Sequence, residues 1–198
     1  MMSLTMRVFL VRPGTIETTL GSGDADIMTK TRTEIERLNL PNDVKDKVLD
    51  AAERMIQEKL KLPTMDLIGA LAFMGLIRVI GEEFEIDTLQ AVASLQTVLR
   101  NMGNIIDYNL DAHFFGNPPP PFKAVDTAGT PFDVGFIDLE EISELSDVLE
   151  SQDLHEEDQD EFSEEHGIEL LEELIEPLCE VLEEAISTGR EIVLTTEG

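Results

Sequence analysis

The residues best suited to chemistry lie in one acidic stretch, residues 153–177, which contains two histidines and no Lys or Arg. Carboxylates bind divalent cations, and a calcium-binding EF-hand loop needs oxygen ligands at alternate positions, Gly at the sixth position and Glu at the twelfth. A loop beginning at Asp153 has His155 at the third position and Asp158 at the sixth. The stretch therefore does not fit an EF-hand.

Other metal-binding patterns are not met either. Di-iron helices carry Glu three residues before each metal-ligating His. Gln152 precedes His155 by three residues and Ser163 precedes His166 by three, and the sequence has no His-Glu-x-x-His motif. We expect loose association of divalent cations with the carboxylates, but neither a specific metal site nor a cofactor.

The remaining candidates for catalysis are isolated residues. Cys179 lies beside Glu180 in an acidic setting that should raise the pKa of its thiol, which is the opposite of what a nucleophile needs. His113 is more typical of a hydrogen-bonded residue at the end of a helix than of a general base. No glycine-rich phosphate loop or serine elbow is present. We therefore expect a protein that is not an enzyme.

The charge of the chain is extreme and one-sided. The formal net charge is −28; residues 1–100 carry 12 Lys+Arg and 15 Asp+Glu, whereas residues 101–198 carry 2 and 27. Adaptation to high salt would spread carboxylates over the whole surface, which this distribution does not show. Because like charges repel, we expect no direct binding to nucleic acid or to an anionic membrane. The expected partner is a basic protein surface.

The sequence also bears on location. A single cysteine, Cys179, cannot form an internal disulfide, and residues 1–14 lack the apolar stretch and cleavage site of a secretory signal. The most apolar segment, residues 67–80, is about half to two-thirds of a bilayer span and is interrupted by Arg78. We expect a cytoplasmic, intracellular protein with no membrane-spanning helix.

The first half of the chain predicts a mainly α fold with an N-terminal core of three helices. Apolar residues recur at helical spacing over residues 43–61, after a predicted cap at Asn42, and over residues 88–107, after a predicted cap at Asp87. A third helix, capped by Thr64 and ending at Ile80, is apolar nearly all round. We expect that helix either at the centre of a monomer or at the contact of a homo-oligomer. Residues 18–30 are rich in Gly, Asp and Thr, which favours a loop.

The two ends of the chain predict short strands. Residues 5–12 are β-branched and apolar and end at Pro13-Gly14, and residues 190–196 form the comparable run near the other end. We expect the two segments to pair as a small terminal β-ribbon.

Proline and glycine interrupt the pattern in the middle of the chain. Four consecutive prolines, Pro118–Pro121, and several glycines exclude a helix or a central strand and favour a stiff polyproline spacer over an SH3-type ligand. We divide the chain into a helical core with an N-terminal strand (1–110), a Pro/Gly-rich linker (111–136), and an acidic helical region with a short C-terminal strand (137–198).

The acidic region carries two amphipathic helical patterns. Leucines and isoleucines recur every three or four residues over 139–149 and 171–186, with Glu on the opposite face. Pro177 should kink or split the second helix unless it lies in a first turn. We expect the apolar stripes to be buried either against the N-terminal helices or against another chain.

The sequence therefore predicts a non-enzymatic protein–protein interaction or assembly protein, such as a scaffold, a chaperone-like factor or a viral accessory protein, whose acidic helices bind a basic protein surface. One alternative is a DNA mimic that inhibits a nucleic-acid-binding protein. Another is a metal-dependent enzyme with a dispersed site. The carboxylates expected to contact the partner are Glu140, Glu141, Glu144, Asp147, Glu156, Glu157, Asp158, Asp160, Glu161, Glu164, Glu165, Glu172 and Glu173.

Overall fold

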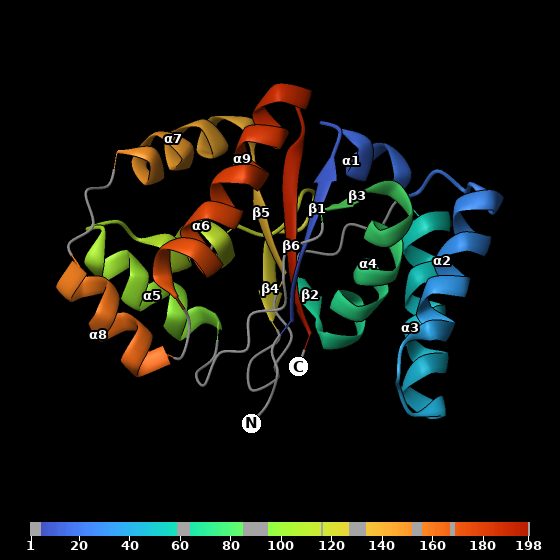
Figure 1. Ribbon diagram of the computed structural model, residues 1–198. Helices are drawn as coiled ribbons and strands as arrows, with labels where there is room; N and C mark the ends of the chain where they lie inside the picture. The colour runs from blue at the N-terminus through green and yellow to red at the C-terminus, as the bar shows by residue number, and fades with distance from the viewer. Residues whose placement is uncertain are drawn as a thin grey trace.

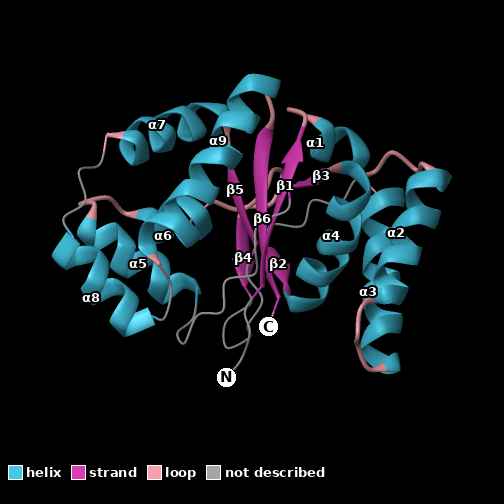
Figure 2. Ribbon diagram, viewed as in Figure 1, coloured by secondary structure: helices cyan, strands magenta, loops and turns pink. Residues whose placement is uncertain are grey.

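The structure of the protein is a computed structural model (Figures 1 and 2). It describes residues 5–58, 64–84, 95–115, 117–126, 134–151, 156–166 and 169–197. Helices dominate this part of the chain, and they surround a small antiparallel sheet. The mainly α character predicted from the sequence is confirmed.

The centre of the molecule is a four-stranded antiparallel sheet in the order β3-β1-β6-β5. The strands are β1 (Thr5–Val11), β3 (Glu82–Phe84), β5 (Val134–Ile137) and β6 (Glu191–Glu197). The two long strands pair along their whole length, with Val8 opposite Leu194. The predicted pairing of the two terminal strands is therefore confirmed, and the pair forms the middle of a larger sheet.

Both faces of this sheet are buried, because side chains alternate along the strands. Val8 and Leu10 of β1 belong to one apolar core, whereas Phe9 and Val11 belong to another. Figure 2 shows helices on both sides of the magenta strands. The protein is thus a three-layer sandwich of helices, sheet and helices. Because both faces of the sheet are buried, the sequences of the central strands contain runs of consecutive apolar residues.

The first helical layer comprises α2 (Ala25–Arg37), α3 (Asn42–Gln57) and α4 (Leu67–Ile80), with the short helix α1 (Thr15–Thr19) near the end of β1. A two-stranded parallel sheet of β2 (Thr64–Asp66) and β4 (Ala124–Asp126) lies beside α4. Residues 69–77 of α4 are all buried within the single chain, so this helix lies at the centre of its layer.

Several predicted helix boundaries in this layer were wrong. Residues 18–30 were expected to form a loop, but α2 begins at Ala25, because the Asp24 side chain accepts hydrogen bonds from the backbone N–H groups of Asp26 and Ile27. Thr64 lies in β2, and Asp66 caps α4 by accepting from the Gly69 N–H. The predicted cap at Asp87 lies outside the described residues.

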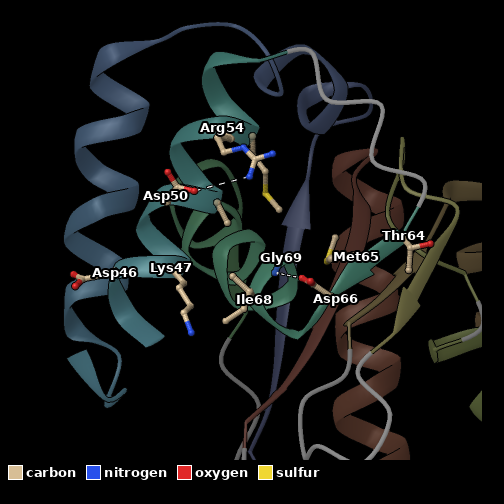
Figure 3. Close-up of a pocket in the computed structure, with 11 residues that line it drawn as sticks. Asp46, Lys47, Asp50, Arg54, Thr64, Met65, Asp66, Ile68 and Gly69 are labelled. Carbon is tan, nitrogen blue, oxygen red and sulfur yellow. Dashed lines mark hydrogen bonds and ion pairs between the residues drawn. The ribbon is translucent and has the colours of Figure 1, made fainter. Parts of the chain in front are cut away.

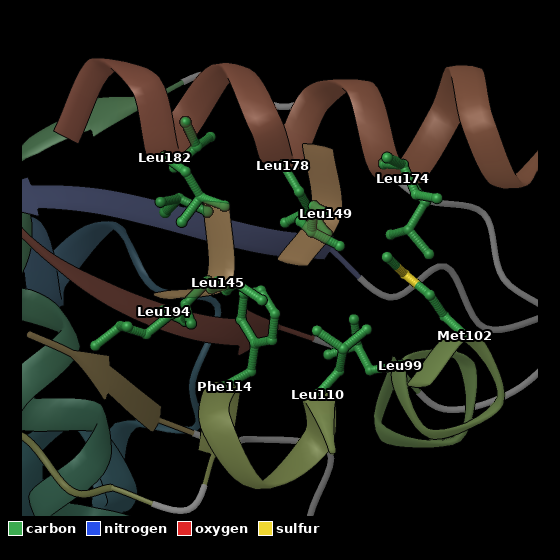
Figure 4. Close-up of a cluster of buried hydrophobic side chains, with 14 of the residues drawn as sticks. Leu99, Met102, Leu110, Phe114, Leu145, Leu149, Leu174, Leu178, Leu182 and Leu194 are labelled. Carbon is green, nitrogen blue, oxygen red and sulfur yellow. The ribbon is translucent and has the colours of Figure 1, made fainter. Parts of the chain in front are cut away.

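The second helical layer covers the opposite face of the sheet. It comprises α5 (Leu95–Ile105), α6 (Leu110–Phe115), α7 (Leu139–Glu150), α8 (Glu156–His166), a π-helical turn η1 (Leu170–Ile175) and α9 (Glu176–Thr188). Figure 4 shows leucines of α7, η1 and α9 meeting α5, α6 and β6 in one apolar cluster. The acidic helices are therefore part of the core.

The predicted grouping of three N-terminal helices is not confirmed. Val98, Leu99 and Met102 of α5 pack in the cluster that contains the acidic helices, whereas α3 and α4 contribute to the cluster on the other face of the sheet. The reason is chain direction: between α4 and α5 the chain passes through β3 at the edge of the sheet, so α5 is free to pack on the other side.

The expected linker, residues 111–136, supplies most of α6 and the strands β4 and β5. β5 lies at the edge of the sheet, and the Phe136 N–H donates to the carbonyl of Asn117. The division into ranges 1–110, 111–136 and 137–198 stays a prediction, and strands from all three ranges contribute to the sheet. Among the described residues, every helix is too short or too polar to cross a bilayer.

Candidate functional site

The outer side of the second helical layer carries a continuous series of exposed carboxylates, which we call the acidic surface. Residues 139–188 contain 20 Asp+Glu and no Lys or Arg. The apolar positions of these helices are buried against the sheet, so the intervening acidic positions face solvent. The acidic surface consists of Glu140, Glu144, Asp147, Glu150, Asp160, Glu161, Glu164, Glu169, Glu172, Glu173, Glu176, Glu180, Glu183 and Glu184.

Most of the predicted partner-binding residues lie on this surface. The exposed members of the predicted set are Glu140, Glu144, Asp147, Asp160, Glu161, Glu164, Glu172 and Glu173. Glu141 is partly buried because its side chain completes the cap of α7. Glu156, Glu157, Asp158 and Glu165 belong to α8, but their side chains lie outside the described part of the structure.

The sequence-based set omitted carboxylates of α7 and α9 that are equally exposed, namely Glu150, Glu176, Glu180, Glu183 and Glu184. The helical spacing that identified the other carboxylates also predicts that these five lie on the polar face of their helices. Contacts of α7 with α9, of α9 with η1 and of η1 with α8 join the elements into one layer. The acidic surface is therefore held on ordered helices that contact one another.

The start of α7 shows how this surface is fixed. The Asp138 side chain accepts from the backbone N–H groups of Glu140 and Glu141, and the Glu141 side chain accepts from the Asp138 N–H, which is a capping box. Asn117 donates to Glu141 at 2.6 Å, and the Tyr108 hydroxyl donates to Glu144 at 3.3 Å. Neutral donors thus position two acidic side chains without cancelling their charge.

The junction of η1 and α9 places the second group of carboxylates. Pro177 lies in the first turn of α9 and has no N–H to donate, and the preceding turn is π-helical. The prediction that Pro177 either marks a first turn or splits the helical pattern is confirmed. Glu173 accepts from the Glu169 N–H at 2.7 Å, and Ser163 of α8 donates to Glu169 at 3.2 Å.

No described cation compensates the exposed carboxylates of α7, η1 and α9. Ion pairs in the described part of the chain include Arg7–Glu83, Arg32–Glu53, Arg37–Glu34, Arg54–Asp50 and Arg190–Glu82, and none of these reaches the acidic surface. Neither α7 nor α9 has a basic residue in its last turn, where the helix dipole favours a positive charge. Among the described residues, the carboxylates of α7, η1 and α9 are therefore not neutralised by a cation of the same chain.

Repulsion within the helices is a further cost of this arrangement. Glu140 and Glu144, and likewise Glu176 and Glu180, are like charges four residues apart on one helix face. Each such pair destabilises a helix by about 0.2–0.5 kcal/mol. A cationic partner would remove this repulsion, so the free protein stores part of the driving force for binding.

Most of the apolar stripe on each of these helices is not available to a partner. Ile142, Leu145 and Leu149 of α7 are at most 3% exposed, and they pack in the core of the same chain. Of the two alternatives left open by the sequence, burial within the chain is correct. Large hydrophobic side chains that remain exposed in the described structure are Leu139, Leu171 and Ile186.

Among the described residues of this layer, Tyr108 and Cys179 have shifted pKa values. Burial raises the pKa of Tyr108 to about 12, and the nearby charges of Glu144 and Glu141 add to the increase. Burial also raises the pKa of the Cys179 thiol, with Glu150 the largest of the contributing charges. The predicted effect of the acidic setting on Cys179 is confirmed, and thiolate chemistry at this position is disfavoured.

Metal ligation has no described candidate. Within the part of the chain that the structure describes, no three His, Cys, Asp or Glu side chains lie close enough together to hold an ion. The side chains of His113, His155 and His166 lie outside that part.

Comparison of the chain with protein families, with curated proteins and with solved structures found no match. A functional proposal for the protein therefore depends on its own surfaces and cavities.

Proposed function

We propose that the protein is a non-enzymatic interaction or assembly protein whose acidic surface binds a positively charged protein. The observation that carries this proposal is the set of exposed carboxylates on α7, η1 and α9, which form no ion pair within the described residues and belong to helices fixed in the core. An ordered surface pays less conformational entropy on binding than a flexible acidic tail does. Scaffolds, chaperone-like factors and viral accessory proteins are the classes that this description fits.

The charge distribution supports directional docking. The helices of the first layer, α2 and α3, carry Lys and Arg interspersed with Asp and Glu, whereas residues 139–188 carry only acids. The resulting field attracts a cationic partner to one side of the sheet and accelerates encounter at low ionic strength. Binding should weaken steeply with salt, because exposed charges are screened beyond about 8 Å at physiological ionic strength.

The buried stripes limit where affinity can come from. Since the core of the chain already uses Ile142, Leu145 and Leu149, a partner meets mainly carboxylates with isolated apolar side chains among them. Affinity then depends on Lys and Arg of the partner making charge-assisted hydrogen bonds to these carboxylates. We place this interaction inside the cell, in line with the single cysteine of the chain.

One observation favours a second candidate, a DNA mimic that blocks a nucleic-acid-binding protein. The carboxylates project from ordered helices packed on a sheet, and a phosphate-like array requires such a fixed support. In this case the partner would also bind duplex DNA, and the two ligands would compete for one site.

The experiment is capture of partners from a lysate of the source organism by the immobilised full chain, with elution by a salt gradient. The test variant is Glu140→Gln/Glu144→Gln/Asp147→Asn. The matched control, Glu36→Gln/Asp43→Asn/Asp46→Asn, removes the same number of exposed charges from the first layer. We expect a basic protein that elutes at lower salt from the test variant than from the control.

Two results would contradict the proposal: capture of no basic protein at low ionic strength, or equal loss of binding in both variants. Addition of duplex DNA to the captured complex separates the two candidates. Displacement by DNA supports mimicry, and retention of the partner supports docking on a surface that does not bind nucleic acid.

A further inference from the structure

A cavity of about 560 Å³ lies in the first helical layer, between α3 and the junction of β2 with α4 (Figure 3). It is separate from the acidic surface, because the central sheet lies between the two helical layers (Figure 1). Its volume falls within the range of about 300–1,000 Å³ that is usual for small-molecule sites.

The floor of the cavity is apolar. Met55 and Met65 line it and are 2% and 1% exposed, and Ile68 and Ala51 extend the apolar lining toward its mouth. Gly69 keeps this floor open: a Cβ there would lie 3.2 Å from Met65 Cγ and 3.5 Å from Met55 Cε. Methionine side chains adapt their shape to a ligand, which suits a floor that must accept a hydrocarbon group.

Three aspartates, Asp46, Asp50 and Asp66, also line the cavity, and two of them have partners within the chain. Asp66 accepts from the Gly69 N–H at 2.8 Å and caps α4, and Asp50 pairs with Arg54 at 3.9 Å. Figure 3 shows Asp46 on the side of α3 that faces away from Ile68. Of the three, Asp46 is the one with no hydrogen bond or ion pair among the described residues, and it lies on the exposed side of α3.

Lys47 differs from its neighbours. It also lines the cavity, and in Figure 3 its side chain extends from α3 toward the end where Ile68 lies. Within the described residues its ammonium makes no ion pair, although the whole chain carries three times as many acidic as basic side chains, 42 against 14. An apolar floor with one uncommitted cation at its edge matches a ligand that has a hydrocarbon body and a single anionic group.

We propose that this cavity binds a small organic carboxylate, with its apolar body on Met55 and Met65 and its carboxylate at Lys47. A carboxylate accepts two or more hydrogen bonds from an ammonium, and the hydrocarbon body leaves water for the methionine floor. A ligand of about ten heavy atoms bound mainly by apolar contact should have a Kd on the order of 0.1–1 mM.

The test uses methionine-methyl NMR spectra of the full chain during titration with octanoate. The matched probes 1-octanol and octylammonium have the same alkyl length with no charge and with the opposite charge. We expect octanoate to shift the methyl signals of Met55 and Met65, while those of Met6 and Met102, which lie in the other core cluster, stay unchanged. Octanol should bind more weakly, and octylammonium should not shift the Met55 and Met65 signals.

Two variants make the assignment specific. Lys47→Gln should raise the Kd for octanoate about threefold to fivefold, as expected for a charge pair at an exposed lysine. The control Lys30→Gln removes a charge from α2 and should leave the Kd unchanged. Ala51→Leu should abolish binding by filling the cavity, and its methyl spectrum shows directly whether it is folded.

The proposal is overturned if octanoate shifts Met6 and Met102 as much as Met55 and Met65. The proposal is also overturned if the protein binds 1-octanol as tightly as octanoate, or if Lys47→Gln binds octanoate as tightly as the unchanged protein does. Either result would show that the ligand carboxylate makes no contribution at Lys47.

Discussion

Gly135 of β5 lies directly against the backbone of Phe114 in α6: a Cβ added to Gly135 would be 1.6 Å from the Phe114 carbonyl oxygen. No side-chain rotation can relieve that overlap, because the contact atom belongs to the backbone. We expect Gly135→Ala to lower the free energy of unfolding by about 3 kcal/mol or more. Urea denaturation followed by circular dichroism measures this change.

The matched control is Gly69→Ala, whose Cβ would meet only side-chain atoms at 3.2–3.5 Å. Those side chains can move, and Ala gains up to about 1 kcal/mol of helix propensity over Gly, so the net change should be small. Similar stability of the two variants would mean that α6 does not pack on β5 as described.

Leu174 and Leu171, which lie within one turn of η1, test whether the acidic region belongs to the core. Leu174 is 1% exposed and Leu171 is 39% exposed. We expect Leu174→Ala to cost about 2–5 kcal/mol and Leu171→Ala less than about 0.5 kcal/mol. Thermal unfolding of both variants measures the difference. Equal, small effects would show that the acidic helices are an appendage of the fold.

Glu191, at the start of β6, provides a test by pH. Burial raises the pKa of this carboxyl group, and the charges of Glu17 and Asp138 raise it further. A raised pKa means that the folded state holds the proton more tightly than the unfolded state, so stability falls as the pH rises through the titration. We expect Glu191→Gln to raise the Tm at pH 7, with a difference that shrinks as the pH is lowered to about 4.

The partners of Glu191 supply the control for that experiment. Glu17→Gln alone should also raise the Tm at pH 7, and its effect should be smaller when residue 191 is already neutral. Strict additivity of the two substitutions would contradict an interaction between these carboxylates.

Cys179 provides a prediction about reactivity. Because burial and the charges of Glu150, Glu183 and Glu176 raise the pKa of its thiol, little thiolate forms near neutral pH. We expect its reaction with an aromatic disulfide at pH 8 to be several-fold slower in the folded protein than in urea. Glu150→Gln should speed the reaction in the folded protein, whereas Glu172→Gln, which changes a charge not among those acting on the thiol, should not.

Helical spacing predicted most of α7 and α9, but it did not predict α8, and the stripe members Leu139, Leu171 and Ile186 are exposed. The buried positions Ile142, Leu145 and Leu149 of α7, and Leu178 and Val181 of α9, are those that the periodicity indicated. Amphipathic periodicity reports which face of a helix is buried, but it does not report what covers that face. The sequence therefore left open whether the stripes met the same chain or another chain, and the structure assigns them to the same chain.

The sheet was harder to predict for two reasons. Residues 6 and 8–11 of β1 are buried on both faces of the sheet, so their sequence has no polar alternation to reveal which helices cover which side. The strand β3 has three residues, and β5 has four that follow a Pro- and Gly-rich segment. Such short strands are stabilised by neighbours distant in the chain, and local propensity cannot identify them.

The two candidate sites also differ in how far the sequence could predict them. The carboxylates of the acidic surface could be identified from composition and spacing, because they occupy the polar face of a regular helix. The cavity beside Lys47 could not, since its floor joins Met55 of α3 with Met65 of β2, and Gly69 and Ile68 of α4 complete it. Its existence depends on tertiary packing between these elements.

The pairing of β1 with β6 has a consequence for synthesis on the ribosome. Val8 can meet Leu194 only after nearly 190 further residues have been made, so a nascent chain that has just completed α7 still lacks the central partner of its first strand. Until then β1 can pair only with the three-residue strand β3. Such late closure of distant contacts slows folding and exposes chains to aggregation. Chains that have gone on to make α8, η1 and α9 carry many negative charges, and their mutual repulsion would keep these chains apart until β6 is made.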